Sequence, residues 1–432
     1  LGGETFTILN TSQTYNFYSY LDFDEATGET LNDAIFNRKA EDLYNFNLEI
    51  VEYELKEANT KFGQAVLAGD ASYDAAFLRD YYLNTELTEG YLMNLDTIPE
   101  FRLDKEWWDG EVTEESRIGK SRKALFAMTD VSLCDFEGTM VTFINENIMT
   151  DLGLDNPYEL VRSGKWTFDK MAELTKDVYQ DIDGDGKRSK GDSSGMLMGW
   201  ATEIDNMKEA FEIHVTEKGK DGFPEITLVN EHTIEAVGKI NDYIHNNDGV
   251  YANGDGDIRT QIYNMFSNGQ GLMYTATLGK SEQLRAMNDD FGILPYPKLD
   301  EAQADYYSTD WSGLMCIPKT VGNPDLVSKV CELLAYYSGD TALPAFYDLV
   351  LGEKLSRDED SKRMLDVIFG SRIYDVGMSY FGGQPNCGSL FYTPSNLVIN
   401  KKSADFASYY AKLEKGAQKE IEKFEKAIAE LE

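Results

Sequence analysis

The chain contains 432 residues, of which 40 are basic and 76 are acidic, and its formal net charge is −36. This balance argues against nucleic acid or an anionic membrane surface as a binding partner. No apolar run approaches the roughly 18 residues that a membrane-spanning helix requires. The length exceeds what one hydrophobic core usually organises, so we expect two domains.

The N-terminal part of the sequence predicts alternating strands and helices. We expect strands at Thr5–Leu9, Phe46–Tyr53 and Tyr73–Leu78, with helices between them at Leu31–Tyr44 and Thr60–Ala68. This order is typical of an α/β fold whose parallel sheet carries helices on both faces. Ligands of such sheets bind beyond the carboxyl ends of the strands. Arg79 and Tyr81, which follow the third strand, are therefore expected at a binding rim.

The middle of the chain predicts further buried strands. Short apolar runs favour strands at Met140–Asn145, Met196–Gly199, Gly271–Tyr274, Phe291–Leu294 and Leu314–Ile317. An amphipathic helix is expected to start at about Pro324. From Ser403 to Glu432 apolar residues recur every three or four positions, which predicts one helix packed on its own domain.

The segment from 181 to 192 has the spacing of a calcium-binding loop. Carboxylates stand at positions 1, 3 and 5, and Gly186 at position 6 permits the sharp turn. An all-oxygen ligand set favours a hard cation, so we predict one structural calcium ion. Aspartate replaces the usual glutamate at position 12, and an acidic surface turn without a metal is the alternative. The predicted ligands are Asp181, Asp183, Asp185, Lys187, Ser189 and Asp192.

Several motifs, spread over the chain as far as about residue 340, together suggest one family. They are Gly69-Asp70 with Tyr73-Asp74, the run Trp107-Trp108-Asp109, the helix start at Trp166-Thr167, and the stretch Phe291-Gly-Ile-Leu-Pro-Tyr-Pro. This set resembles the extracellular solute-binding proteins of ABC importers, in the carbohydrate-binding family of the maltose-binding type. The resemblance becomes weak between Ser356 and Asn400.

The resemblance implies a two-lobed, periplasmic-binding-protein-like α/β fold, with discontinuous domains joined by a hinge and a ligand cleft between them. We expect residues 1–130 with 275–322 in the first lobe and 131–274 with 323–432 in the second, so that the chain crosses near 130, 275 and 322. The second lobe would hold the calcium loop 181–192 and the C-terminal helix 403–432. The implied function is to bind a carbohydrate, with an oligosaccharide favoured, and to deliver it to the permease subunits of an ABC transporter. A monomer without enzymatic activity is expected.

Aromatic residues at predicted strand ends are the candidate sugar contacts. Aromatic rings stack on the C–H faces of sugars, while carboxylates and guanidinium groups bond to the hydroxyls. By resemblance, Tyr380 and Phe381 stand where sugar-binding relatives present an aromatic platform. Ordinary packing is the alternative for each aromatic residue. The predicted ligand-binding set is Arg79, Tyr81, Asp130, Trp200, Trp311, Tyr380 and Phe381.

Two other functions stay open on the sequence alone. The chain lacks HExxH and P-loop motifs, but its many carboxylates leave room for the acidic pair of a glycan-degrading enzyme. A binding protein of this kind could also carry a non-sugar solute.

The four cysteines have no metal-binding or redox spacing, and we expect them to be buried and unpaired. The resemblance also leads us to expect an extracellular, cell-surface lipoprotein whose signal and anchor are not part of this sequence.

Overall fold

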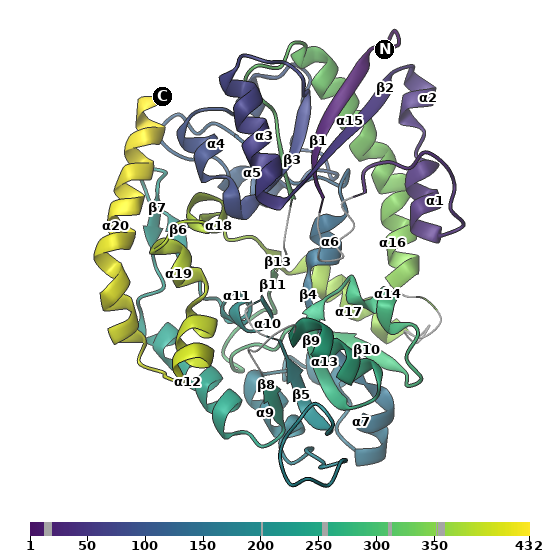
Figure 1. The fold of residues 1–432 in the computed structure, drawn as a ribbon, viewed down its shortest axis with the longest axis vertical. Coiled ribbons are helices and arrows are strands. Elements are labelled where there is room, and N and C mark those ends of the chain that lie inside the picture. The colour runs from purple at the N-terminus through teal and green to yellow at the C-terminus, as the bar shows by residue number, and fades with distance from the viewer. Residues whose placement is uncertain (13–19, 200–201, 253–257, 310–312, 351, 353–358) are drawn as a thin grey trace.

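The computed structural model describes residues 1–12, 20–199, 202–252, 258–309, 313–350, 352 and 359–432. Within these residues, the two larger sheets lie toward opposite ends of the molecule, and helices surround each (Figure 1). This is the two-lobed α/β arrangement that the sequence predicts. None of the described helices is both long and apolar enough to cross a membrane.

The first lobe is built on a four-stranded sheet with the order β12-β3-β1-β2. β1, β2 and β3 run parallel, with Ile8 of β1 opposite Ile50 and Ala75, as the alternation of strands and helices predicts. β12 runs antiparallel to β3, with Leu314 opposite Leu78. The strands are β1 (Thr5–Ser12), β2 (Asn47–Glu54), β3 (Ala75–Arg79) and β12 (Gly313–Cys316).

Two helices cover the two faces of this sheet because side chains of β1 alternate between them. Phe6 and Ile8 share a core cluster with Val327 of α15 (Pro324–Asp340). Leu9 belongs to a second cluster, which contains Phe62 of α3 (Leu55–Leu67). Around them lie α1 (Thr30–Phe36), α2 (Ala40–Tyr44), η1 (Asp80–Tyr82), α4 (Asn84–Thr88), η2 (Leu95–Thr97) and α5 (Gly110–Glu115).

The second lobe is built on a five-stranded sheet with the order β10-β4-β9-β5-β8. β4 pairs antiparallel with both β9 and β10, while β5 pairs parallel with β8 and β9. The rings of Phe143 and Tyr274 stack across the β4–β9 pair with centroids 5.9 Å apart. The strands are β4 (Met140–Asn145), β5 (Ser194–Met198), β8 (Val250–Ala252), β9 (Gly271–Thr277) and β10 (Phe291–Leu294).

Helices surround the second sheet, and one hairpin reaches from this lobe to the first, where the backbone N–H of Gly119 donates to the carbonyl of Gly222 over 2.9 Å. The helices are α7 (Glu146–Leu152), α8 (Pro157–Arg162), α9 (Phe168–Thr175), α12 (Glu231–Asn246), α13 (Ile258–Ser267), α14 (Lys280–Leu284) and α17 (Glu359–Gly370), and the hairpin is β6 (Thr216–Lys218) with β7 (Pro224–Ile226). Thr167 caps α9 as predicted, because its side chain accepts a hydrogen bond from the backbone N–H of Lys170.

The sheets divide the chain differently from the predicted boundaries of 275–322 and 323–432. β10 belongs to the second sheet, because Ile293 pairs with Phe143, so the chain leaves this lobe after β10 rather than near 275. α15 packs on the first sheet, so the next crossing follows this helix rather than residue 322. The passage near 130 lies where it was predicted, through α6 (Cys134–Gly138).

Several elements lie between the two sheets. β11 (Ser308–Thr309) pairs parallel with β13 (Arg372–Ile373), so two distant segments run side by side here. α16 (Ala342–Val350) contacts both α1 and α14. The remaining elements are α10 (Thr202–Asp205), α11 (Met207–Ala210), α18 (Gly377–Phe381), α19 (Cys387–Phe391) and the π-helix η3 (Pro394–Ile399).

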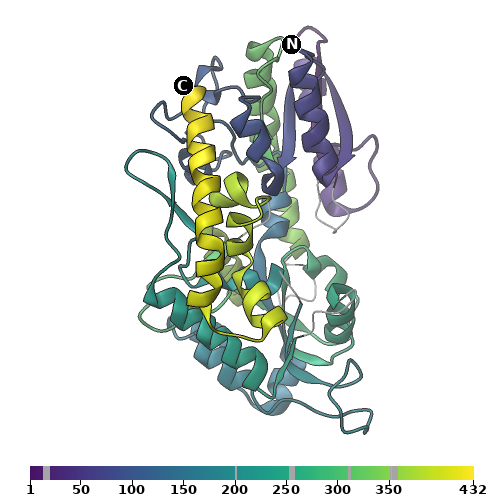
Figure 2. The same cartoon turned by 60° about the vertical axis from the view of Figure 1, so that its left-hand side comes forward.

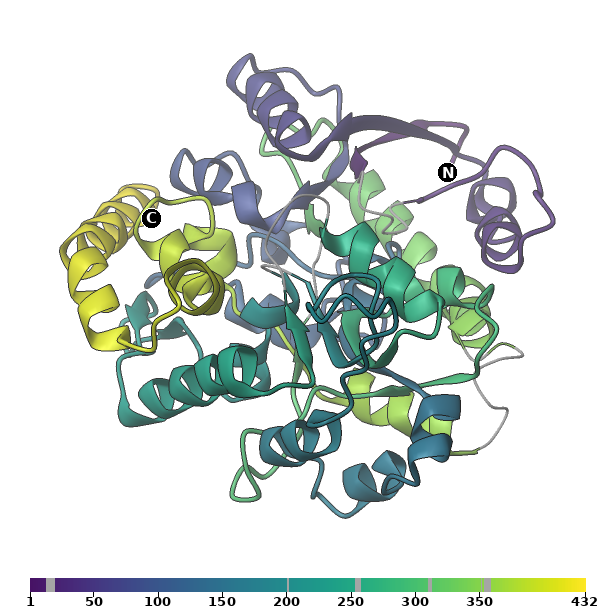
Figure 3. The ribbon, with the colours of Figure 1, turned by 60° about the horizontal axis from the view of Figure 1, so that its bottom comes forward.

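The C-terminal helix α20 (Phe406–Glu430) contacts both lobes instead of packing on one domain. It touches α12 of the second lobe and α4 of the first, and Figure 2 shows it along one side of the molecule. At its far end, Lys123 Nζ donates to the carbonyl of Leu431 over 2.8 Å. Seen from the second-sheet end, the C-terminal helices gather on one side (Figure 3). All four cysteines are buried and free, as predicted.

Candidate functional site

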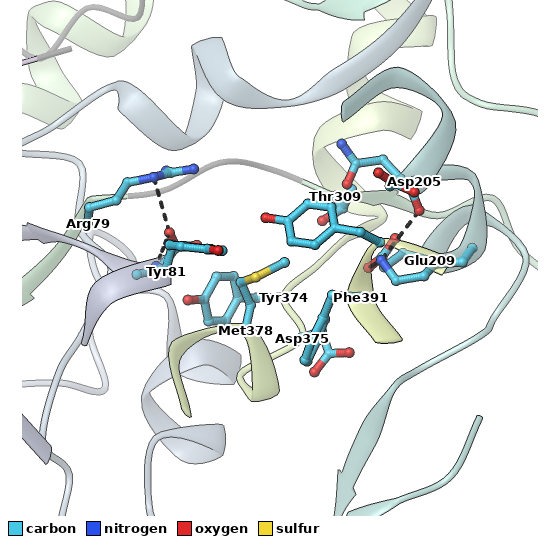
Figure 4. A pocket seen from close by; sticks show the side chains of 13 residues that line it. Arg79, Tyr81, Asp205, Glu209, Thr309, Tyr374, Asp375, Met378 and Phe391 are labelled. Atoms are coloured by element: carbon cyan, nitrogen blue, oxygen red, sulfur yellow. Dashed lines mark hydrogen bonds and ion pairs between the residues drawn. The ribbon is translucent and has the colours of Figure 1, made fainter. Parts of the chain in front are cut away.

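A pocket lies where the two lobes meet, and both lobes contribute side chains to its walls. Figure 4 shows Arg79 and Tyr81 on one side and Asp205 and Glu209 on the other, with Tyr374 between them. In open α/β sheets, ligands bind beyond the carboxyl ends of the strands, and the end of β3 stands at this pocket. The described residues that line it are Arg79, Asp80, Tyr81, Asp205, Asn206, Lys208, Glu209, Thr309, Tyr374, Asp375, Met378, Phe391 and Tyr392.

The wall from the first lobe carries a buried ion pair. Arg79 Nε lies 3.3 Å from Asp80 Oδ1, and both side chains are only 5–6% exposed. The backbone N–H of Tyr81 donates to the same oxygen over 2.6 Å. Burial raises the pKa of Asp80, and the charge of Arg79 and the Tyr81 N–H oppose that shift. The ion pair of Arg79 and Asp80 is therefore held in place at the end of β3 by burial and by the Tyr81 N–H.

The wall from the second lobe carries another buried ion pair, between Lys208 and Glu209. Lys208 Nζ also donates to the backbone carbonyl of Asp205 over 3.3 Å. The carboxylate of Asp205 accepts hydrogen bonds from the backbone N–H of Ser395, over 2.8 Å, and from its hydroxyl. Burial raises the pKa of Asp205 to about 7 even though these hydrogen bonds lower it.

The segment after β13 closes the pocket between the two walls. Asp375 accepts hydrogen bonds from the backbone N–H of Val215 over 3.1 Å and of Gly377 over 2.9 Å. Burial raises the pKa of Asp375 to about 6, and the nearby charge of Glu209 adds to the shift. The hydroxyls of Tyr374 and Ser379 lie 2.5 Å apart, which fixes the tyrosine ring.

Tyr81 offers the pocket an aromatic face that is only partly buried. Its ring centroid is 4.9 Å from that of Tyr82 and 6.3 Å from that of Tyr392. A Cβ atom at Gly383 would lie 3.0 Å from the Tyr81 carbonyl oxygen, so a glycine lets the α18–α19 turn come this close.

The enclosed space is small. It leaves about 30 Å³ for the centres of water-sized molecules. One water needs about 10–15 Å³ by this measure, so a sugar ring does not fit without movement. Ligand entry therefore requires the lobes to separate or the lining side chains to rearrange.

The structure brings only some of the predicted ligand-binding residues to this pocket. Arg79 and Tyr81 line it, whereas Asp130 lies away from it, beside Asp135 and Arg372. Trp200 and Trp311 fall outside the described residues.

The predicted platform of Tyr380 and Phe381 is part of the core. Both side chains are at most 1% exposed, and both rings pack on Phe424 of α20, with centroid separations of 5.0 and 5.2 Å. Tyr380 Oη donates to the carbonyl of Glu115 over 3.1 Å. The apolar side of α20 covers these rings, and neither lines the interlobe pocket, although Tyr380 borders the groove beside it.

No motif in the sequence marks the charged residues of the second-lobe wall. Asp205, Lys208 and Glu209 stand among apolar neighbours such as Ile204 and Met207, which are fully buried. A dense mixture of charged and apolar residues is a weak signal for burial of the charges. In a chain with 76 acidic residues, it does not single out three positions.

The predicted calcium loop brings three of its carboxylates together. Atoms of Asp181, Asp183 and Asp185 lie within 4.8 Å of one another, the spacing of ligands around one ion. Gly186 has a φ of +71°, the left-handed conformation expected at the turn. Asp192 is buried and accepts hydrogen bonds from the backbone N–H groups of Ile182 and Ser189, at 3.1 and 2.7 Å. The residues therefore fit a hard cation held by the three converging carboxylates.

No protein-family model matches the sequence, and none of the curated proteins matches it. Many solved structures match its fold. The GacH receptor of Streptomyces glaucescens is 13% identical, with a TM-score of 0.60 over 97% of this chain and 99% of that one. UgpB from Mycobacterium tuberculosis, in complex with glycerophosphocholine, is 16% identical, with a TM-score of 0.62 over 91% and 95%.

A maltose complex of MalE from Listeria monocytogenes is 14% identical, with a TM-score of 0.56 over 99% of this chain and 98% of that one. Another structure, from Thermotoga lettingae, is described as an ABC transporter solute-binding protein bound to tagatose. The chain therefore has the two-lobed fold of the solute-binding proteins of ABC transporters.

Proposed function

We propose that this protein works outside the cell, where it binds a carbohydrate in the interlobe pocket and delivers it to the permease of an ABC transporter. The carbohydrate would be released chemically unchanged. The observation that carries the proposal is the pocket itself, which is walled by both lobes of a solute-binding fold and lined by aromatic and charged side chains. Several structures of the same fold are complexes with sugars, including maltose and cycloalternan. We propose further that the ligand is an oligosaccharide, that the protein is a monomer, and that a lipid anchor attaches it to the cell surface.

The pocket's chemistry supports a polyhydroxylated ligand. The carboxylates and the cations can bond to hydroxyl groups, and the rings of Tyr81, Tyr374 and Tyr392 offer faces for sugar C–H groups. The complex of UgpB with glycerophosphocholine shows that this fold also accommodates a phosphodiester. Binding of a non-sugar solute is therefore the alternative that an experiment must exclude.

Calorimetric titration with a panel of sugars and sugar-free solutes tests the proposal. A saccharide should bind to the unmodified chain, and Tyr81→Ala should weaken that binding by at least tenfold. Tyr336→Ala is the control, because Tyr336 is 45% exposed on α15 and does not line the pocket. Recovery of the bound sugar unchanged supports a carrier, whereas its depletion would establish an enzyme. Binding only to sugar-free solutes would contradict the proposal.

We also propose that the loop 181–192 holds one calcium ion. The support is the convergence of Asp181, Asp183 and Asp185 together with the left-handed glycine of the turn. The loop lies between α9 and β5 in the chain, and Arg188 within it donates to the carbonyl of Val250 over 2.8 Å. A bound calcium ion would offset two of the three negative charges and stabilise this end of the second lobe.

A further inference from the structure

The charges that line the interlobe pocket do not balance. Among the described residues, the lining includes four carboxylates (Asp80, Asp205, Glu209, Asp375) and two cations (Arg79, Lys208). All six side chains are buried, with exposed fractions between 3% and 9%. With every group ionised, the pocket therefore carries two uncompensated negative charges in a site from which most water is excluded.

Pairing within the pocket shows which carboxylates lack a cation. Arg79 pairs with Asp80, and Lys208 pairs with Glu209. Within the described chain, neither Asp205 nor Asp375 forms an ion pair; hydroxyl and backbone N–H groups hydrogen-bond to them instead. Hydrogen bonds from neutral groups orient these carboxylates but supply no positive charge to balance them.

One carboxylate of the pocket also keeps an open bonding position. Glu209 Oε2 is buried and has no hydrogen-bond partner in the described structure, while its other oxygen pairs with Lys208. The Nδ2 group of Asn206, on the same wall, is likewise buried without a partner. A buried polar atom without a partner has lost its hydration, so a ligand that supplies a donor to Glu209 Oε2 or an acceptor to Asn206 Nδ2 restores the lost interaction.

The acidic character continues into an adjoining groove. This groove shares Tyr374 and Asp375 with the interlobe pocket, and its further lining includes four more carboxylates, one lysine and one histidine. The lysine, Lys218, donates to the carbonyl of Glu114 over 2.7 Å and pairs with one of these carboxylates, Glu115, over 3.6 Å, so the other three have no lysine partner in the groove. The four carboxylates are those of Glu111, Glu115, Glu212 and Glu217. A ligand that extends from the pocket into this groove meets negative charge along its length.

We propose that the ligand is a cationic saccharide, one that carries free amino groups, and that Glu209 accepts a hydrogen bond from such an ammonium group. This inference rests on the proposed carbohydrate-binding function. An ammonium group supplies both the missing donor for Glu209 and charge for Asp205 and Asp375, and the rings of Tyr81, Tyr374 and Tyr392 are compatible with a cation. A neutral sugar supplies only the donor, and a uronic acid or sugar phosphate adds charge of the wrong sign.

Saccharides that differ only in their charge test which sign of ligand charge the pocket prefers. Glucose, galactose and mannose are titrated beside their 2-amino and uronic acid counterparts, and β-1,4-linked tetramers of glucose, glucosamine, N-acetylglucosamine and glucuronic acid are titrated likewise. In every series that binds, the amino sugar should bind at least tenfold more tightly than the neutral one, about 1.4 kcal/mol. The uronic acid should bind most weakly, and added salt should reduce the preference.

Glu209→Gln keeps the shape of the side chain and removes its charge. It should reduce the preference for the amino sugar by tenfold or more, with a smaller effect on the neutral sugar. Glu235→Gln, at an exposed position of α12, should leave the preference unchanged. Equal or tighter binding of the neutral or acidic partner to the unmodified protein overturns this inference and leaves the proposed function standing. If no saccharide of any charge binds, the proposed function fails and the inference fails with it.

Discussion

Arg372 Nη1 lies 2.6 Å from Asp135 Oδ2, and this ion pair joins β13 to α6 at the place where the chain passes between the two sheets. The guanidinium group also lies over the ring of Phe136, 4.3 Å from its centroid. Asp130 is close to both charged groups. Burial and the charge of Asp135 raise the pKa of Asp130 to about 7, and Arg372 opposes the shift. One arginine thus faces two carboxyl groups at the crossing, the buried Asp135 and the partly buried Asp130.

Replacing Arg372 by leucine should destabilise the protein by about 3–5 kcal/mol at pH 8, because it leaves the buried Asp135 and its neighbour Asp130 without their cation. The loss of stability should be smaller at pH 5.5, because Asp130 is then protonated and needs no counter-charge. Urea unfolding of the variant and the unmodified chain at both pH values measures the difference.

Lys329→Ala is the control for that experiment. Lys329 pairs with Asp325 four residues earlier on α15, but the two side chains are 41% and 55% exposed. Such a pair contributes at most about 1 kcal/mol, so the control should change little at either pH. An equal loss at both pH values for Arg372→Leu would show that its packing, and not its charge, matters.

The ligand-free protein should become less stable as the pH rises from 5 to 8. The folded-state pKa values of Asp130 and Asp205 are raised to about 7, so the folded chain retains protons that the unfolded chain has already released. The free energy of unfolding therefore falls with pH between the unfolded pKa, near 4, and about 7. Asp205→Asn should flatten this dependence, whereas Asp151→Asn, at an exposed position, should preserve it. Urea titrations at half-unit intervals of pH give both slopes, and identical slopes would contradict the assignment.

Substitutions of two tyrosines should have different effects, one on stability and the other on ligand binding. Tyr380→Ala should destabilise the protein by about 3–5 kcal/mol, because its ring is buried against Phe424. Tyr81→Ala should reduce the affinity for the sugar while changing the melting temperature less, because the Tyr81 ring is only partly buried. Melting curves without ligand and titrations with ligand, on both variants, provide the comparison. The reverse pattern would mean that the two residues have been assigned the wrong roles.

Chelation should lower the melting temperature if the loop 181–192 holds calcium. Asp183→Ala should melt at the lower temperature with or without chelator, because the loop can no longer hold the ion. Asp192 is a poorer site for this test, since its carboxylate also accepts backbone N–H groups of the loop whether or not metal is present. Elemental analysis of the purified protein completes the experiment. An unchanged melt after exhaustive chelation, with no bound calcium, would exclude the site.

Opening of the cleft should be visible in solution. The pocket leaves about 30 Å³ for water-sized molecules, so a form that admits a sugar must be wider. Small-angle scattering of the ligand-free protein should give a larger radius of gyration than the structure itself, and saturating sugar should reduce it. A radius that does not respond to a ligand bound in calorimetry would argue against closure by lobe motion.

Features that depend only on neighbouring residues could be predicted from the sequence. The alternation of strands and helices predicted the parallel order of β1, β2 and β3, and the side-chain cap of Thr167 placed the start of α9. The 1, 3, 5 spacing of aspartates brought Asp181, Asp183 and Asp185 together. Each of these follows from backbone geometry over a few residues, which a sequence pattern records directly.

Tertiary structure alone decided where the chain crosses and which charges are buried. β10 joined the second sheet because β4 offered it a partner strand, and α15 stayed on the first lobe because its apolar face matched Phe6 and Ile8. Tyr380 and Phe381 became core residues because α20, more than 20 residues later, folded over them. The charged wall at Asp205 and Glu209 likewise depends on segments far apart in the chain, since Ser395 bonds to Asp205. Burial is set by what packs against a residue from a distance, and no local pattern in the sequence contains that information.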